Sequence, residues 1–288
     1  MAKMIENTTG VLQDFSLDVL CKAIQRNRQA LHALSRLWPG ADIREDDEVS
    51  WCITGLREPF FNCVYRTNIK RGHVDAIIED AMARAKSRNV HLWWFIATDT
   101  HPANIAKNLK AHGFFPNRVT GMALDLFTIN SELSELANLK ITAVRDPDTL
   151  RLWSRIAVTG FEMPEEVEGD WFNWYGNIGL GPGLPIQHFL GWWNGEPAAT
   201  ASLLLAEGVA GIYNVAVVPQ KRRLGLGLGM TMQPLREARN MGYRIAILQA
   251  SQQGLSVYRR IGFQECCKLM SYVWISGPRF PGQTDTGR

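Results

Sequence analysis

The sequence predicts an α/β fold in which a mixed, mostly antiparallel central sheet is flanked by helices, with two copies of this fold in tandem. Three observations support this prediction. Strand-like and helix-like stretches alternate along the chain, three consecutive strands near residues 186–218 are joined by tight turns, and one order of elements occurs in both halves. A chain of 288 residues is also long enough for two domains of ordinary size.

The first half opens with a helical pattern. Apolar residues recur at helical spacing from Leu17 to Leu34, and Pro39-Gly40 ends the pattern, so we expect a helix, continuous or broken in two, near residues 16–38. Strands and helices are then expected to alternate, with strands at 49–53, 62–69, 91–97 and 122–127 and helices at 74–85 and 101–112.

A polar segment from Asn130 to Lys140 follows the last of these strands. We therefore expect a domain boundary there, with an N-terminal domain over residues 1–135 and a second domain over residues 136–288.

The second half begins with a strand at 141–144, and Asp146-Pro147 is a typical N-cap and first-turn pair for a helix that runs to about Thr159. Three strands follow, and the turn pairs Asn194-Gly195 and Glu207-Gly208 between them predict an antiparallel meander. Helix, strand, helix and strand are then expected at 226–241, 244–249, 252–261 and 264–274. Pro234 stands inside the first of these helices, where we expect a kink or a later helix start.

An internal repeat relates the two halves. The order strand, helix, strand, helix, Gly-Phe, strand occurs over residues 62–127 and again over residues 211–274. The sequences Lys-Ala-His-Gly-Phe, ending at Phe114, and Arg-Arg-Ile-Gly-Phe, ending at Phe263, stand at matching places. Two copies of one fold explain this repetition.

Composition excludes several classes of protein. The net charge of +3 gives no dense basic face, so no nucleic acid partner is expected. The five cysteines lack Cys-x-x-Cys spacing, which predicts neither a disulfide framework nor a metal site. No apolar run approaches the roughly 18 residues that a membrane span needs, so we expect no membrane partner and a cytoplasmic location.

A basic, glycine-rich loop over residues 219–227 separates the strand that ends at Val218 from the following helix. A helix N-terminus presents unpaired N–H groups and a partial positive charge, and both favour an anion. Because Gly225 and Gly227 have no Cβ, their backbone can approach a pyrophosphate closely and adopt positive φ, while Arg222 can add charge-assisted hydrogen bonds.

Other interpretations of this loop remain open at this point. It can be a tight strand-to-helix turn that binds nothing. Two other phosphate-binding motifs fit less well, because a dinucleotide fingerprint needs glycine where Met230 stands and the lysine–serine pair of a Walker motif is absent.

A second motif, Tyr-Arg-Arg-Ile-Gly-Phe from Tyr258 to Phe263, follows the loop after one helix and one strand. With this motif and the preceding meander, the chain from Ile141 to Trp274 resembles the GCN5-related N-acetyltransferase (GNAT) superfamily. The resemblance implies the GNAT fold and acetyl-CoA as the acyl donor, with no metal.

The resemblance also assigns residues to acetyl-CoA. The family's Arg/Gln-x-x-Gly-x-Gly/Ala loop binds the pyrophosphate, and backbone groups of the preceding strand, which splays from its neighbour, bind the pantetheine arm and polarise the thioester. The residues implied are Val215, Val217, Arg222, Arg223, Leu224, Gly225, Leu226, Gly227, Leu228 and Ser251. Tyr258 matches the tyrosine that protonates the leaving thiolate, a role suited to a group with a pKa of about 10. The alternative for Tyr258 is a helix residue packed on the sheet.

The general base is less clear. Several family members carry a glutamate on the strand before the loop, but residues 211–214 include no carboxylate. Tyr213 or Asn214 can instead orient a water molecule that relays the proton of the acceptor ammonium.

The segment from Phe161 to Leu180 occupies the stretch that borders the acceptor site in this family. Its acidic and aromatic composition suits a cationic amine, and the candidate contacts are Phe161, Glu165, Glu166, Trp171, Trp174 and Tyr175. The alternative is a solvated acidic helix start whose aromatic side chains face the core.

The first half has no Arg-x-x-Gly-x-Gly loop, and Leu109 stands where Tyr258 maps. We therefore expect a degenerate, non-catalytic GNAT-like copy followed by an active one. The predicted function is acetyl-CoA-dependent N-acetyl transfer to a primary amine of a small molecule, by direct attack in a ternary complex. The alternatives are a non-catalytic acyl-CoA sensor and an acetyltransferase for protein N-termini or lysines, and the sequence leaves the oligomeric state open.

Overall fold

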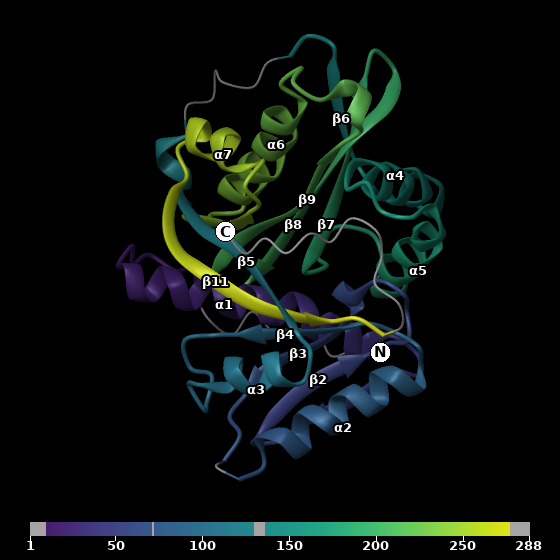
Figure 1. Ribbon diagram of the computed structural model, residues 1–288. Helices are drawn as coiled ribbons and strands as arrows, with labels where there is room; N and C mark the ends of the chain where they lie inside the picture. Colours follow the sequence, from purple (N-terminus) through teal and green to yellow (C-terminus); the bar gives the residue numbers. More distant parts are fainter. Residues whose placement is uncertain (1–9, 71, 130–135, 277–288) are drawn as a thin grey trace. The chain divides into compact units, whose positions relative to one another are not determined.

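The computed structural model describes residues 10–70, 72–129 and 136–276 (Figure 1). The chain divides into two compact units. Unit 1 comprises the described residues of Met1–Leu34 together with Val119–Leu269, and unit 2 comprises Ser35–Arg118 together with the described residues of Met270–Arg288.

Unit 1 contains a mixed sheet with helices on both faces. Its helices are α1 (Leu17–Ala33), α4 (Pro147–Gly160), α5 (Glu168–Ile178), α6 (Leu226–Asn240) and α7 (Leu255–Ile261). Its complete strands are β6 (Leu139–Ala143), β7 (Ile186–Trp193), β8 (Glu196–Ala206), β9 (Val209–Val217) and β10 (Ile245–Ala250). Parts of β5 (Phe115–Asp125) and β11 (Gln264–Trp274) complete the sheet, whose order is β6-β7-β8-β9-β10-β5-β11.

The predicted meander is confirmed. Strands β7, β8 and β9 pair antiparallel in succession. Asn194 and Gly195 both have positive φ, at 52° and 84°, as do Glu207 and Gly208, so the two turns follow the right-handed twist of the hairpins. The Asp146 carboxylate accepts a hydrogen bond of 2.8 Å from the amide of Thr149 and caps α4, as its sequence predicts.

The next two strands form a fork. Strand β9 runs parallel to β10, but the pairing covers only Ala210–Ile212 against Ala246–Leu248. From Tyr213 to Val217 the described partner of β9 is β8. The two strands therefore separate after Ile212, which is the splay that the GNAT resemblance implies.

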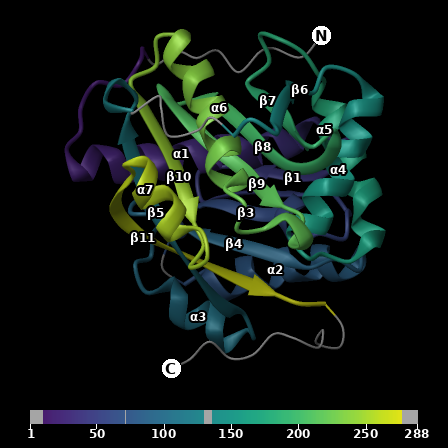
Figure 2. The same cartoon turned by 90° about the horizontal axis from the view of Figure 1, so that it is seen from above.

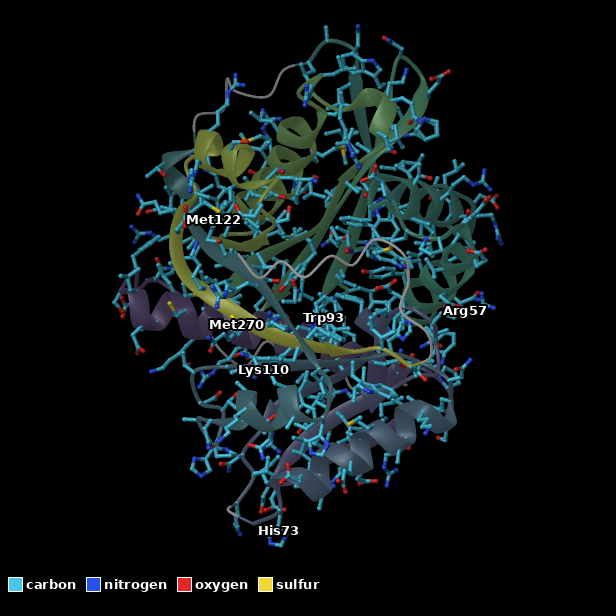
Figure 3. All side chains as sticks on the ribbon, in the orientation of Figure 1. Arg57, His73, Trp93, Lys110, Met122 and Met270 are labelled. Carbon is cyan, nitrogen blue, oxygen red and sulfur yellow. The ribbon has the colours of Figure 1, made fainter. Side chains whose placement is uncertain are left out.

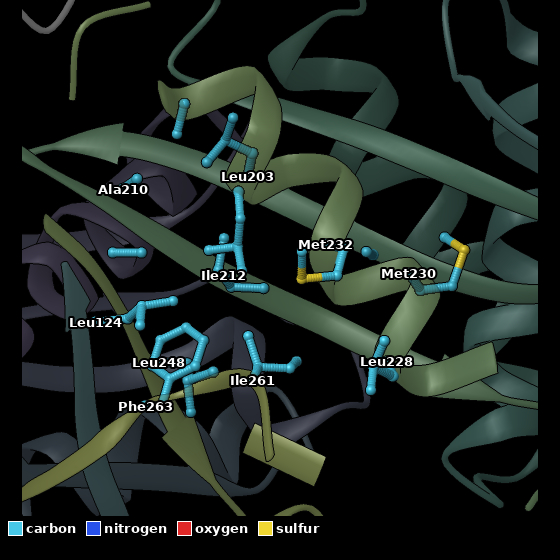
Figure 4. Close-up of a cluster of buried hydrophobic side chains, with 14 of the residues drawn as sticks. Leu124, Leu203, Ala210, Ile212, Leu228, Met230, Met232, Leu248, Ile261 and Phe263 are labelled. Atoms are coloured by element: carbon cyan, nitrogen blue, oxygen red, sulfur yellow. The ribbon is translucent and has the colours of Figure 1, made fainter. Parts of the chain in front are cut away.

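The core of unit 1 follows the two-residue period of its strands. Ala246 and Leu248 of β10 face the cluster built on α6 and α7, which also holds Ile212 and Phe263 (Figure 4). Ile247, on the other face of β10, packs against α1. Helices α6 and α1 thus cover opposite faces of these strands (Figures 1 and 2). Pro234 stays inside α6, which begins at Leu226, so the later helix start is wrong.

Unit 2 is a smaller sheet covered by two helices. Its elements are the 3₁₀-helices η1 (Leu34–Leu37), which continues α1, and η2 (Pro59–Phe61), the strands β1 (Asp42–Glu45), β2 (Val49–Ile53), β3 (Asn62–Thr67) and β4 (Leu92–Ile96), and the helices α2 (Val74–Ser87) and α3 (Ile105–Ala111). The strand order is β1-β2-β3-β4-β11. Trp51 and Trp94, both fully buried, lie in its core with residues of α2 and α3. The sequence did not predict β1.

Each half of the chain ends in a strand that pairs within the other half's sheet. Strand β5 follows α3 in the chain but pairs with β10, where Met122 lies opposite Leu248. Strand β11 pairs with β4 in unit 2, where Met270 lies opposite Ile96. Figure 3 labels Met122, Met270 and Trp93 of β4.

This exchange of strands, with α1 packed in unit 1, is why the compact units do not follow one boundary near residue 135. The two units are defined by strand pairing between residues that are far apart in the sequence. The predicted boundary rests instead on the polarity of the linker. Residues 130–135 of that linker lie outside the described residues. The division into 1–135 and 136–288 stays a prediction about the two halves of the sequence.

Candidate active site

A groove of about 810 Å³ opens in unit 1 beside the first turn of α6. Its volume is in the range of small-molecule and cofactor sites. It is lined by Gly160, Phe161, Val215, Ala216, Val217, Lys221, Arg222, Arg223, Gly225, Leu226, Gly227, Leu228, Ser251, Gln253, Gly254, Ser256, Val257, Tyr258 and Arg260. The predicted acetyl-CoA residues thus gather along one groove, except Leu224, whose side chain is exposed.

The loop that leads into α6 has the conformation that its glycines allow. After β9, the short 3₁₀-helix η6 (Pro219–Lys221) is followed by Arg223 and Gly225, both with positive φ, at 64° and 86°. Gly225 is the N-cap of α6, so the first turn of this helix leaves its N–H groups unpaired toward the groove. A Cβ at Gly225 would be strained by its φ and would lie 3.3 Å from Leu136 Cδ1.

Gly227 contributes in a different way. It lies within α6 without a positive φ, so the expectation of positive φ holds for Gly225 alone. A Cβ added at Gly227 would have Val217 Cγ2 as its nearest neighbour, at 3.9 Å. The missing side chain therefore leaves open space above the helix N-terminus, where an anion can approach the backbone.

The cations around the groove differ in their partners. Arg222 is tied back to the protein, because its Nη2 donates to the carbonyl of Gly160 at 2.9 Å and its Nη1 lies 3.3 Å from Glu162 Oε2. Among the described residues, Arg223 and Arg260 have no ion pair. These two guanidinium groups are the available positive charges at the groove.

Tyr258 presents its side chain to the groove from α7. Its ring packs over Gly254, where a Cβ would lie 2.8 Å from Tyr258 Cε2, and it meets Phe263 edge-on with 6.0 Å between ring centroids. Burial raises the pKa of Tyr258 to about 12, so the phenol keeps its proton at neutral pH. Within the described part of the chain, nothing accepts or donates a hydrogen bond at its hydroxyl.

Tyr213 lies on the α1 face of the fork rather than in the groove. Its hydroxyl donates to Asn27 Oδ1 at 2.8 Å and accepts from Gln249 Nε2 at 3.4 Å. Burial raises the pKa of Tyr213 to about 12. Because its proton is directed at an amide oxygen that cannot take it, this geometry favours a bridging role for Tyr213 over proton relay.

The same contact explains the missing carboxylate of this strand. A Cβ built on Gly211 would lie 2.2 Å from Asn27 Oδ1. Helix α1 therefore fills the space in which a glutamate at this position would stand, and the sequence could not show this.

Asn214 forms a β-bulge in β9. The register between β8 and β9 shifts between Thr200 and Ser202, and Asn214 has a φ of 51°. Its side chain is hydrogen-bonded to Tyr175 and Ser202 behind the strand and does not line the groove.

The aromatic residues expected to contact the acceptor are mostly in the core. Trp171, Trp174 and Tyr175 are buried and cluster with Trp153 and His188, with ring centroids 4.5 to 5.9 Å apart. Helix α5 packs on α4, and Tyr175 also contacts His188 of β7, so this arrangement does not support contact of these side chains with a substrate.

The remaining acceptor candidates are exposed. Phe161 is 39% exposed and lines the groove. Glu165 and Glu166 are exposed but do not line it.

Eight groove residues are not among the predicted site residues, namely Gly160, Ala216, Lys221, Gln253, Gly254, Ser256, Val257 and Arg260. Gln253, Ser256 and Arg260 recur at spacings of three and four, so a helical stripe is the signal that could have revealed them. Leu109, the counterpart of Tyr258 in the first half, is fully buried in the core of unit 2.

Two further findings concern other kinds of site. Among the described residues, no helix has the length and apolar character that crossing a membrane requires. The same residues contain no group of three or more His, Cys, Asp or Glu side chains arranged to hold a metal ion.

Comparison with known proteins agrees with this geometry. The family model of the acetyltransferase (GNAT) domain matches residues 208–266, a segment from β9 to β11 that includes the loop and Tyr258. A search of curated protein sequences found no match.

Solved structures match over most of the chain. A GCN5-related N-acetyltransferase from Kribbella flavida has a TM-score of 0.65 at 18% identity, covering 88% of this chain and 96% of that one. One from Sphaerobacter thermophilus has a TM-score of 0.60 at 15% identity, covering 96% and 98%. A tandem GNAT protein from the clavulanic acid biosynthesis pathway has a TM-score of 0.56 at 15% identity, covering 92% and 94%. The chain therefore has the fold of the GCN5-related N-acetyltransferases, and the family model of the acetyltransferase (GNAT) domain matches its residues 208–266.

Proposed function

We propose that this protein is an N-acetyltransferase that transfers the acetyl group of acetyl-CoA to a primary amine of a small molecule. One observation carries the proposal. A groove that begins at the N-terminus of α6 ends beside a protonated tyrosine, at a fork between two strands.

The groove fits the donor in its chemistry. The amides at the start of α6 and the space above Gly227 suit the pyrophosphate, and Arg223 and Arg260 supply positive charge. Among the described residues, β9 has no strand partner on the side of the fork after Ile212, although the Val217 carbonyl accepts from Arg222 Nε at 3.4 Å. Backbone groups near Val215 therefore suit the amide groups of a pantetheine arm.

Acyl transfer then needs two proton movements. The amine nitrogen attacks the thioester carbonyl, a C–N bond forms and the C–S bond breaks. The departing thiolate takes the hydroxyl proton of Tyr258, and the amine releases its extra proton to solvent. A proton from solvent then restores the Tyr258 hydroxyl, so a neutral amine and acetyl-CoA give an amide and free CoA with atoms and charge in balance. An acceptor that starts as an ammonium ion releases one proton in addition.

The acidic stretch before α5 supports a cationic acceptor. Glu165 and Glu166 are exposed there, and Phe161 offers a ring at the groove itself. Negative charge near a site raises the local concentration of an ammonium substrate.

A thiol-release assay with acetyl-CoA and a panel of small amines, polyamines and lysine-containing peptides tests the proposal. We expect CoA release with at least one small amine and a mass increase of one acetyl group on that amine. Release only with peptides would overturn the small-molecule acceptor and favour a protein acetyltransferase.

One observation favours a second candidate, a sensor that binds acyl-CoA without turnover. Among the described residues that line the groove, none is a carboxylate, and Glu162 nearby is paired with Arg222. Titration calorimetry distinguishes the two, because binding of acetyl-CoA without CoA release for any amine supports the sensor.

A further inference from the structure

Behind the bulge in β9, a buried chain of hydrogen bonds connects β7, β8, β9 and α5. Asn214 Nδ2 donates to the Tyr175 hydroxyl at 2.6 Å and to Ser202 Oγ at 3.1 Å. Thr200 Oγ1 donates to the Asn214 carbonyl at 2.8 Å, and Ser202 Oγ lies 2.7 Å from His188 Nδ1. Thr200, Ser202 and Tyr175 have no exposed surface. These hydrogen bonds therefore hold both the side chain and the backbone of Asn214.

The bulge needs such support. A left-handed φ is unfavourable for most residues other than glycine, although asparagine adopts it more readily than most, and a bulge removes a residue from the ladder of backbone hydrogen bonds. Asn214 adopts φ of 51°, and its carbonyl is satisfied by Thr200 instead of by the ladder. Strained backbone of this kind persists where surrounding contacts fix it.

The bulge decides which side chains of β9 reach the groove. Ala210 and Ile212 face the core beneath α6, and an unbroken two-residue period would continue on that face with Asn214 and Ala216. The structure instead has Val215 and Val217 on this face, because the extra residue shifts the period by one.

We infer that Tyr175 and Ser202 are positioning residues for acyl transfer, which act through Asn214 by holding the β9 bulge and so set the backbone that meets the acyl donor. The inference rests on the proposed function. It assigns Tyr175 to the β9 bulge instead of to the acceptor, and Asn214 to backbone geometry instead of to water orientation.

His188 is the last member of this series of hydrogen bonds. Burial lowers its pKa to about 3, so the ring stays neutral, and its Nε2 has no hydrogen-bond partner among the described residues. A neutral ring between Trp153 and Tyr175 packs the cluster without bringing a charge to the bulge.

The first experiment compares Asn214→Gly with Asn214→Ala. Glycine adopts positive φ freely, whereas alanine does not, and both lack the amide. We expect Asn214→Gly to keep kcat within about threefold of wild type and Asn214→Ala to lose roughly 10- to 100-fold, with the Kd of acetyl-CoA unchanged in both. Equal losses in the two variants would overturn the inference, because the amide itself would then be needed.

The second experiment places Tyr175→Phe in two backgrounds. In the wild-type background we expect kcat to fall about tenfold with little change in the KM of the amine. In the Asn214→Gly background we expect no further loss, because the hydroxyl then has no amide to hold. A raised KM of the amine, or the same loss in both backgrounds, contradicts a role through the bulge.

Hydrogen exchange at the amides of residues 215–217 reports on the conformation of the bulge and does not require turnover. Exchange should be faster in Asn214→Ala and Tyr175→Phe and close to wild type in Asn214→Gly. Unchanged exchange in Asn214→Ala would contradict the inference. If wild type acetylates none of the amines, only the proposed function is contradicted.

Discussion

The Tyr213 hydroxyl donates a hydrogen bond of 2.8 Å to Asn27 Oδ1 and thereby joins β9 to α1. Asn27 is fully buried, and its Nδ2 also donates to the carbonyl of Ala206 at 2.9 Å. Helix α1 thus closes the face of the fork opposite α6 and leaves no room for a side chain at Gly211.

Replacing Asn27 should therefore lower the free energy of unfolding more than it affects catalysis. Asn27→Ala leaves the Ala206 carbonyl and the Tyr213 hydroxyl without this partner, and we expect the free energy of unfolding to fall by about 2 kcal/mol in urea denaturation. Lys22→Ala serves as the control, since Lys22 makes an exposed ion pair with Asp18 on the same helix and should change stability little. A loss as small as the control's would show that the Tyr213–Asn27 bond does not hold α1.

Filling the space above Gly227 should block the donor. We expect Gly227→Leu to reduce acetyl-CoA affinity at least a hundredfold in calorimetry, because the side chain enters the space proposed for the pyrophosphate. Gly169→Leu in α5, where nothing lies within 4 Å of an added Cβ, is the matched control for a glycine in a helix. Unchanged affinity in Gly227→Leu, with the fold intact by circular dichroism, refutes the pyrophosphate assignment.

Tyr258→Phe should separate chemistry from binding. Removing a general acid typically costs about 10² in rate, so we expect kcat to fall by that order while the Kd of acetyl-CoA changes less than about threefold. The pKa of about 12 means that the wild-type rate should show no decline from ionisation of Tyr258 up to pH 10. A wild-type kcat in the variant identifies a different acid.

Arg259 and Arg260 are neighbours on α7 with different surroundings. Arg260 lines the groove, whereas Arg259 pairs with Glu265. We expect Arg260→Gln to weaken acetyl-CoA about tenfold and to make binding less salt-dependent, because one cation–phosphate contact is lost. Arg259→Gln should bind as wild type does, and equal weakening in the two variants would exclude a specific contact of Arg260.

Local signals carried most of what the sequence could predict. The N-cap at Asp146, the Asn194-Gly195 turn and the positive φ of Gly225 each depend on a few neighbouring residues, whereas the place of Tyr258 at the groove was implied by the family resemblance. The family resemblance then supplied the fork, which no local pattern indicates.

Features that depend on distant partners were not predictable. The bulge at Asn214 requires its partners on β8 and α5, and the exchange of β5 and β11 requires a choice between strands of similar pattern. The composition of α5 was compatible with contact to an acceptor or with burial in a core, and the packing of α5 against α4 decides for burial.

His188 should make stability depend on pH. Its folded pKa of about 3 is below the 6.5 of an unfolded histidine, so the unfolded chain binds more protons between these values. Stability is therefore greatest above pH 6.5 and declines as the pH falls toward 3. From pH 7 to pH 5 we expect His188 to account for a loss of about 1–2 kcal/mol in the free energy of unfolding.

His188→Asn, which keeps a polar atom near Ser202, should be less stable at pH 7 but show a shallower decline to pH 5. Because burial also lowers the pKa of His91, His91→Asn is the matched comparison, and it should remove less of the decline, since His91 is less buried than His188. An unchanged slope in His188→Asn would mean that His188 takes up its proton without unfolding the protein.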